Sequence, residues 1–296
     1  MSLLARLSDA ETHGASIGET ELTFRPGSLR PGEYEADIGT AGSVTLVCDA
    51  VLPLICELSA PIRIEIRGGT NVKWAPTAPY YRHVKLPLLW QFGLAARLDV
   101  ARHGFYPRGD GVARLRLLPS QPHRIVLPGR ASIDRARVYS LADTGLAEAE
   151  VAERQRREAV DRVSERDIPV VESVTTHTDA PSPGSAILVR LEGESALAGF
   201  DAVGERGLPA EDVAGRACEQ IDAFCASPAG IDAHMGDQLL AILAVVGGRV
   251  IIPRVTDHVR AQLQLLDAFD IPVELDRQQD SIALVADGLE KPYSST

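Results

Sequence analysis

The alternation of hydrophobic and polar positions predicts a succession of short strands and amphipathic helices. Residues 62–66 alternate apolar and charged side chains, as a half-buried strand does. Leu3, Leu4 and Leu7 have helical spacing, and the apolar run at 44–54 predicts a buried helix. The same criteria predict strands at 21–24, 34–38, 95–100 and 112–118, and a helix at 84–92.

A similar order of elements returns later in the chain. Strands are predicted at 198–203 and 249–252, and helices at 210–224, from about 237, and at 259–269. The recurrence predicts repeated units of helices packed on a mixed four-stranded sheet, in an α+β or α/β fold.

The middle of the chain has its own alternation of strands and a helix. Strands are predicted at 131–139, 170–175 and 186–191, and a strongly charged helix at 147–163. We therefore expect a small inserted α/β domain at 128–202, between a large-domain segment at 1–127 and a last repeat at 203–296.

Groups capable of phosphate chemistry cluster near the C-terminal end. Asp237 and Gln238 precede a run of leucines, which predicts that they lie in the first turn of a helix. Free N–H groups and the positive dipole end there favour an anion. Because His234 and His258 come from adjacent elements, the pattern indicates a nucleotide site with an imidazole nucleophile.

Charge narrows the choice of partners. Acidic residues outnumber basic ones 41 to 30, for a net charge of -11, and the only lysines are Lys73, Lys85 and Lys291. Such a surface suits a high-salt cytoplasm, although an arginine-rich, lysine-poor chain equally fits a biased genomic base composition. The negative charge argues against duplex DNA as a partner, because counterion release needs clustered cations. The charge still allows the end of one nucleic-acid strand to be held by a few arginines.

The cysteines and the hydropathy exclude further classes. Cys48, Cys56, Cys218 and Cys225 have no CxxC spacing, so neither a zinc cluster nor a disulfide framework is predicted. No window approaches the roughly 20 apolar residues of a membrane span, and the N-terminus lacks the apolar region of a signal peptide. We expect a cytoplasmic protein with no membrane partner and no metal site of its own.

Glycine-rich and polar motifs recur at intervals over nearly the whole chain. They are Gly14–Gly18, Glu21–Gly27, Gly39–Ser43, Gly68–Thr70, Ala75–Pro76, His103–Gly111, Gly204–Gly207 and Asp237–Leu239. In this order the set resembles the RNA 3'-terminal phosphate cyclases. No single glycine-rich turn carries the likeness, so the resemblance is specific.

The resemblance implies a ligase that uses ATP to convert an RNA 3'-terminal phosphate into a 2',3'-cyclic phosphodiester. In that family a histidine attacks the α-phosphate of ATP, AMP passes to the RNA phosphate, and the neighbouring 2'-hydroxyl closes the ring as AMP leaves. His258 matches the nucleophile by position, just before a predicted helix. Histidines ordinarily titrate near pH ~6.5, so much of an ordinary imidazole is neutral and nucleophilic in a cytoplasm.

Further site residues follow from the resemblance. Asp237 and Gln238 match an acid–amide pair that contacts the nucleotide, and His234 and Pro76 match groups on either side of the base. Asp49 stands in the nucleotide pocket where relatives carry an amide. Magnesium is expected with the triphosphate. The candidates for an RNA phosphate are Arg102, Arg108 and Arg206, of which the last two could instead anchor turns. The remaining histidines, at 13, 83, 103, 123 and 177, match no partner.

The N-terminal part of the chain departs from the pattern of the family that it resembles. Met1 falls about where the second helix of the family's first repeat begins, so the first repeat is expected to be incomplete and its phosphate-binding loop missing. Either the start codon was placed too far downstream or the chain is a remnant, and weak or absent activity is expected. A normal rate of AMP incorporation would contradict this. The inserted domain is expected to be thioredoxin-like.

Two other functions compete with the cyclase interpretation. The first is the non-catalytic cyclase-like class that assists ribosome assembly, against which the presence of His258 argues. The second is a carboxyvinyl transferase, whose domains are built from similar units. The run at 104–111 argues against it, and a test for enolpyruvate turnover would decide.

Overall fold

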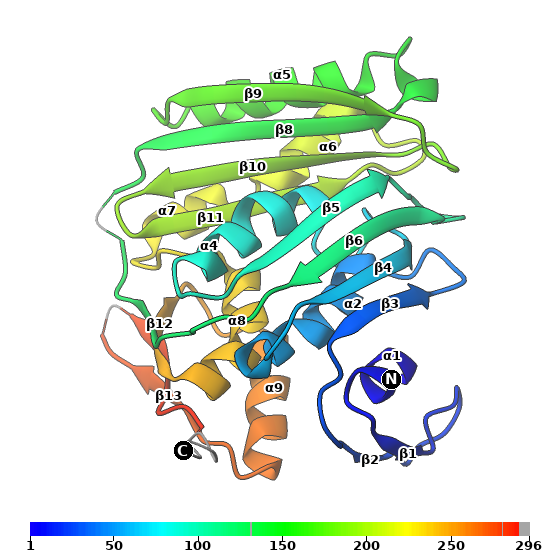
Figure 1. Ribbon diagram of the computed structural model, residues 1–296. Helices are drawn as coiled ribbons and strands as arrows, with labels where there is room; N and C mark the ends of the chain where they lie inside the picture. Colours follow the sequence, from blue (N-terminus) through cyan, green and yellow to red (C-terminus); the bar gives the residue numbers. More distant parts are fainter. Residues whose placement is uncertain (131, 280, 290–296) are drawn as a thin grey trace.

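The computed structural model describes residues 1–130, 132–279 and 281–289, and in these it contains three four-stranded sheets and one two-stranded sheet (Figure 1). Helices pack on the sheets, so the predicted α+β class is confirmed. Across the described part of the chain, no helix combines the length and the apolar character needed to cross a membrane.

Repeat A comprises residues 32–117. Its sheet has the order β3-β4-β6-β5, in which β3 and β4 are parallel and the other neighbours antiparallel. The alternation expected at 62–66 is observed, since every second residue of the strand is buried. The elements are β3 (Gly32–Asp37), α2 (Val44–Val51), η1 (Leu52–Glu57), β4 (Ile62–Gly68), α3 (Ala78–Tyr80), η2 (Tyr81–Lys85), α4 (Leu86–Trp90), β5 (Ala96–Arg102) and β6 (Gly111–Leu117).

Repeat B has the same topology but is split along the chain. Its sheet has the order β7-β12-β14-β13, with β7 and β12 parallel and the other neighbours antiparallel. The predicted repetition of one α/β unit is therefore confirmed. The elements are β7 (Ile125–Leu127), α8 (Ala233–Val246), β12 (Gly248–Ile252), α9 (Asp257–Ala268), β13 (Val273–Arg277) and β14 (Ile282–Ala286).

An inserted unit separates β7 from α8 and forms the upper part of Figure 1. Its four strands have the order β11-β10-β8-β9. Strands β8 and β9 are parallel, and the other neighbours are antiparallel. The elements are β8 (Arg135–Asp143), η3 (Thr144–Leu146), α5 (Val151–Ser164), β9 (Val170–Thr178), β10 (Ser185–Gly193), β11 (Ala196–Val203), α6 (Ala210–Cys218) and α7 (Ile221–Ala226).

The inserted unit has its own hydrophobic core. Val163 from α5, Val213 from α6 and Phe224 from α7 pack with Val189 of β10. Helices α6 and α7 thus complete this core although they follow the predicted border at 202. The domain borders and the thioredoxin-like topology stay predictions, and the predicted start of the first strand at Ala131 lies outside the described residues.

Several elements differ in extent from the sequence expectation. The helix expected at 44–54 ends at Val51 and continues as the 3-10 helix η1, and the one expected at 210–224 is two helices. Near the N-terminus, α1 (Ser2–Leu7) confirms the leucine spacing, and β2 (Thr23–Arg25) pairs with a strand that was not predicted, β1 (Glu11–His13). Three-residue strands carry too short a pattern to be recognised.

Candidate active site

The N-terminus of α9 presents His258 to solvent. Thr256 is the N-cap, and its hydroxyl oxygen accepts a hydrogen bond from the Val259 backbone N–H at 3.1 Å. The same hydroxyl donates to Oδ2 of Asp237 at 3.3 Å, which joins α9 to α8. His258 is the second residue of the helix and is exposed, whereas Val259 is buried. The cap therefore fixes the first turn while the imidazole stays accessible.

Helix α8 begins earlier than the sequence indicated. Asp232 is its N-cap and accepts hydrogen bonds from the backbone N–H groups of His234 and Met235 at 3.0 and 2.9 Å. Asp237 and Gln238 are the fifth and sixth residues of α8, so the expectation that they lie in its first turn is wrong. The reason is that a carboxylate cap satisfies the first free N–H groups. His234 occupies the first turn and is exposed.

The Asp237 carboxylate lies in a polar environment that includes His234 and His258. Its carboxylate is only 8% exposed, and burial raises its pKa, while the neighbouring His234 and His258 rings and the Thr256 hydroxyl act to lower it. Beside it, Oε1 of Gln238 is buried and accepts no hydrogen bond from the described residues. A buried acceptor without a partner is costly, so this amide is available for a donor from a ligand.

An acidic wall formed by the partly buried Asp201 and the buried Asp232 joins repeat A, the inserted unit and repeat B at this point. The Tyr80 hydroxyl donates to both oxygens of Asp232 at 3.0 Å, and the Gly199 N–H donates to one of them at the same distance. Asp201 of β11 accepts from the Thr77 N–H at 2.8 Å. Burial raises the pKa of both Asp201 and Asp232. Sequence reasoning missed these residues, although an aspartate directly before an apolar helix is a capping signal.

The structure places Pro76 beside this wall and Asp49 in an ion pair. Pro76 is half-buried, directly precedes Thr77, and its carbonyl accepts from the Thr45 hydroxyl at 2.7 Å. Asp49 lies on α2, where its Oδ1 accepts from Nζ of Lys85, a side chain that is only 1% exposed. Since a buried ammonium already engages this carboxylate, the nucleotide contact of Asp49 stays a prediction.

The three candidate arginines lie at the end of a strand and in two loops: Arg102 is the last residue of β5, and Arg108 and Arg206 lie in loops. Arg102 donates to the Asp110 carbonyl at 2.9 Å, and the Arg108 guanidinium is 3.8 Å from the Asp110 carboxylate. Both therefore border the β5–β6 connection. The Arg108 backbone N–H donates to Ser182 of the inserted unit at 3.2 Å. Arg206, in the β11–α6 connection, is exposed. The Arg108 and Arg206 side chains can reach a ligand from solvent.

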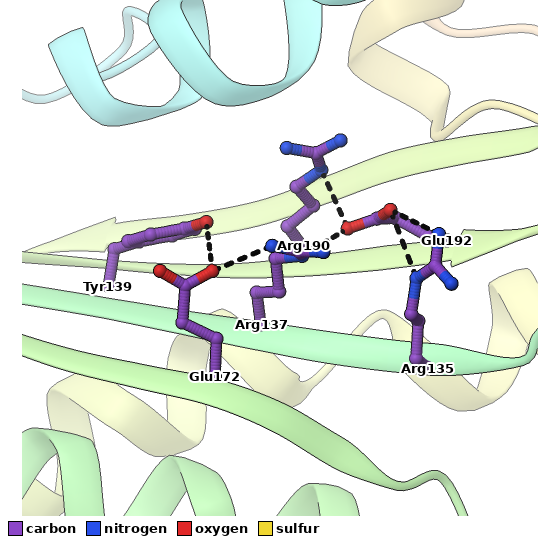
Figure 2. A network of polar contacts seen from close by, with 6 residues as sticks. All are labelled: Arg135, Arg137, Tyr139, Glu172, Arg190 and Glu192. Carbon is purple, nitrogen blue, oxygen red and sulfur yellow. Dashed lines mark hydrogen bonds and ion pairs between the residues drawn. The ribbon is translucent and has the colours of Figure 1, made fainter.

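Two other charged regions are internally paired. A surface hollow of about 270 Å³ lies over β3, β4 and β6, where Arg63 pairs with Glu33 and Arg114 with Glu65. On β8, β9 and β10 of the inserted unit, side chains of opposite charge alternate (Figure 2). In that network Glu192 pairs with Arg135, Arg137 and Arg190, and Glu172 with Arg137 and the Tyr139 hydroxyl. Such mutual neutralisation is typical of strand-to-strand contacts, so we assign neither region to chemistry.

No group of three or more histidine, cysteine, aspartate or glutamate side chains is placed to hold a metal ion in the described ranges. The Asp237 carboxylate and the Gln238 amide oxygen nevertheless suit the polar groups of a nucleotide, and Asp237 is bonded to the Thr256 cap of the helix that carries His258. The arrangement offers an accessible imidazole at the start of α9 and two oxygen acceptors on α8.

Comparisons with known proteins give a family match and several similar proteins. A family model described as RNA 3'-terminal phosphate cyclase matches residues 1–273. The chain is similar to the RNA 3'-terminal phosphate cyclase of Halobacterium salinarum, with 37% identity over 97% of this chain and 85% of that protein. It is also similar to those of Methanopyrus kandleri, at 35% identity over 92% of the chain and 79% of the relative, and Thermococcus kodakarensis, at 36% over 90% and 77%.

Proposed function

The chain belongs to the RNA 3'-terminal phosphate cyclase family, and we propose that it uses ATP to convert an RNA 3'-phosphate into a 2',3'-cyclic phosphodiester through an AMP group carried on His258. One observation supports this most strongly. The exposed imidazole of His258 lies in the turn capped by Thr256, and the Thr256 hydroxyl donates to the buried carboxylate of Asp237 on α8.

The first step forms a phosphorus–nitrogen bond. A ring nitrogen of His258 attacks the α-phosphorus of ATP, the bond to the β-phosphate oxygen breaks, and diphosphate leaves. The imidazole must be neutral to supply its electron pair. Its exposed position at the helix N-terminus gives a phosphate access, and the positive end of the helix dipole favours that anion.

The second and third steps consume the AMP group. An oxygen of the RNA 3'-phosphate attacks the phosphorus of AMP, and the phosphorus–nitrogen bond breaks. The RNA 2'-hydroxyl then attacks its own 3'-phosphorus, loses its proton, and AMP leaves. Overall, ATP and RNA 3'-phosphate give the cyclic phosphodiester, AMP and diphosphate. Cleavage of ATP to AMP and diphosphate is thus coupled to a ring closure that is otherwise uphill.

Residues around His258 hold the nucleotide in this proposal. Gln238 contributes its buried amide oxygen as an acceptor, and His234 and Pro76 lie on the two elements that border the acidic wall. Magnesium bound to the triphosphate would neutralise charge that develops as diphosphate leaves. The Asp237 carboxylate is the hard oxygen ligand that would face such a complex, while the Gln238 oxygen accepts from the nucleotide.

The test is incorporation of label from α-labelled ATP into the protein, followed by chase with an RNA carrying a 3'-phosphate. We expect at least a weak uptake of an acid-labile, base-stable label, which is lost on addition of RNA while cyclic ends form. A protein that takes up no label under conditions where it is folded would contradict the proposal. If the His258→Ala variant still takes up label, the nucleophile is a different residue.

A further inference from the structure

Two aromatic side chains near the candidate site are almost fully exposed. Trp74 is 95% exposed and Tyr106 is 77% exposed. Trp74 also has a φ of 61°, in the left-handed region that a bulky residue rarely adopts. Backbone strain that holds a large apolar ring out in water indicates a function for that ring. By contrast, Trp90 is 58% exposed and its indole N–H donates to the Ala96 carbonyl at 2.8 Å.

The loops that carry the two rings are bonded to each other. The backbone N–H groups of Thr70 and Asn71 both donate to the Gly104 carbonyl, at 2.9 and 3.2 Å. This joins the β4–α3 loop, which contains Trp74, to the β5–β6 loop, which contains Tyr106. Because Trp74 lies two residues before Pro76, the same loop continues into the candidate nucleotide site.

Cations border these rings. The Lys73 ammonium lies 5.9 Å from the centroid of the Trp74 ring and pairs with Glu205 at 2.6 Å. That ion pair brings the β11–α6 loop, with the exposed Arg206, to the same edge. Arg108 follows Tyr106 by two residues, and its side chain is 68% exposed. The carboxylates of Asp110 and Glu205 on this edge already have cationic partners.

From this arrangement we infer that Trp74 and Tyr106 form a stacking platform for the unpaired bases next to the RNA 3'-phosphate, with Arg108 and Arg206 on the backbone phosphates. The inference rests on the proposed function, which places the RNA end at His258. Aromatic side chains stack on the open faces of unpaired bases, so the substrate is single-stranded at its 3' end. Because the net charge of the chain is -11, two arginines alone give a small electrostatic gain, and stacking adds the affinity that they do not supply.

Fluorescence can test the platform directly, because the chain has only two tryptophans. In a Trp90→Phe background, Trp74 is the sole indole. A short single-stranded oligoribonucleotide with a 3'-phosphate should quench its emission saturably, and a blunt duplex of the same sequence should not. Equal quenching and equal affinity for the duplex would overturn the inference.

Substitutions give a second readout. Trp74→Leu and Tyr106→Leu should each raise the Kd for the single strand about tenfold, since stacking of one base accounts for a change of about five- to 150-fold. Trp74→Phe should restore most of the affinity because it keeps a ring. The matched control is Phe269→Leu, an aromatic residue that is 68% exposed at the other end of α9, and its Kd should stay within about twofold.

The outcomes separate the platform from the catalytic proposal. Label uptake from ATP is measured on the wild-type chain without RNA, so its absence refutes the proposed function alone. If Trp74→Leu, Tyr106→Leu and Phe269→Leu all bind the single strand equally well, the platform is refuted while label uptake can still succeed.

Discussion

Repeats A and B share one topology but use their second helical segment differently. In repeat A that segment, α3 to α4, buries Tyr80, Tyr81 and Leu89 almost completely. In repeat B the corresponding α9 buries only Val259. Both segments begin with a threonine cap after the second strand of the sheet, at Thr77 and at Thr256.

The difference shows how one unit can serve stability in one copy and chemistry in the other. After the cap, repeat A continues with the buried Ala78 and Pro79, whereas repeat B continues with the exposed Asp257 and His258. A segment that uses most of its positions for the core cannot also present many side chains to a ligand. A helix with a single buried position can, at the cost of a smaller contribution to the core.

The largest expected effect is on repeat B. His258→Ala should reduce label uptake from ATP by at least about 10³-fold, because it removes the proposed nucleophile. The unfolding midpoint should hardly change, since the ring is exposed. The control is His177→Ala, which removes a histidine of the inserted unit that pairs with Glu153. Equal label uptake by the two variants would contradict the assignment of His258 as the nucleophile.

In repeat A the largest expected effect of a substitution is on the free energy of unfolding. Lys85→Met should lower the free energy of unfolding by about 3 kcal/mol, because it leaves the Asp49 carboxylate without its buried partner. Lys73→Met, which removes a 45% exposed ammonium, should cost less than about 1 kcal/mol. Urea titration measures both. If Leu263→Ala in α9 proved as costly as Lys85→Met, the contrast between the repeats would be lost.

The two caps offer a matched pair. Thr77→Ala and Thr256→Ala should each lower stability by about 1 kcal/mol, since each removes a side-chain acceptor at a helix N-terminus. Only Thr256→Ala should also reduce label uptake, because Asp237 loses a donor that helps to lower its pKa. The optimum of uptake should move to higher pH, and Thr256→Ser should restore it. A loss of uptake that is the same in both alanine variants would argue against a special role for repeat B.

The smallest effect concerns the contact of repeat A with the inserted unit. His83 stacks on Tyr139 with ring centroids 4.1 Å apart, and burial lowers its pKa to about 4. Between pH 6.5 and 4 the unfolded chain therefore binds a proton that the folded chain does not, so stability falls as the pH falls. The loss from pH 6.5 to 5.5 is about 1 kcal/mol for this ring.

His83→Phe keeps an aromatic ring against Tyr139 but cannot take up the proton. Its free energy of unfolding should therefore depend less steeply on pH than that of the wild type in this range. Denaturant titrations at several pH values measure the difference. Parallel curves for the two proteins would show that His83 is no more shielded in the folded state than in the unfolded chain.

The sequence by itself indicated most of the element types, the repetition and, through the family resemblance, the candidate nucleophile. It did not indicate the strands β1, β7, β13 and β14. Alternation at 62–66 and helical spacing around α8 and α9 are local patterns, and the motifs at His103–Gly111 and Asp237–Leu239 are local too. Each reflects an environment that a residue shares with near neighbours in the chain, so it can be read without knowing the fold.

Asp232 is a local capping signal for α8, but only the tertiary structure decided what holds this cap in place and which groups surround His258. The Asp232 cap is fixed by Tyr80, 152 positions away, and by Gly199 of the inserted unit. The acidic wall at Asp201 likewise depends on a hydrogen bond between distant segments, and so does the contact between the loops that carry Trp74 and Tyr106. No periodicity encodes such contacts, because they form only when packing brings separate elements together and burial makes an unsatisfied polar group costly.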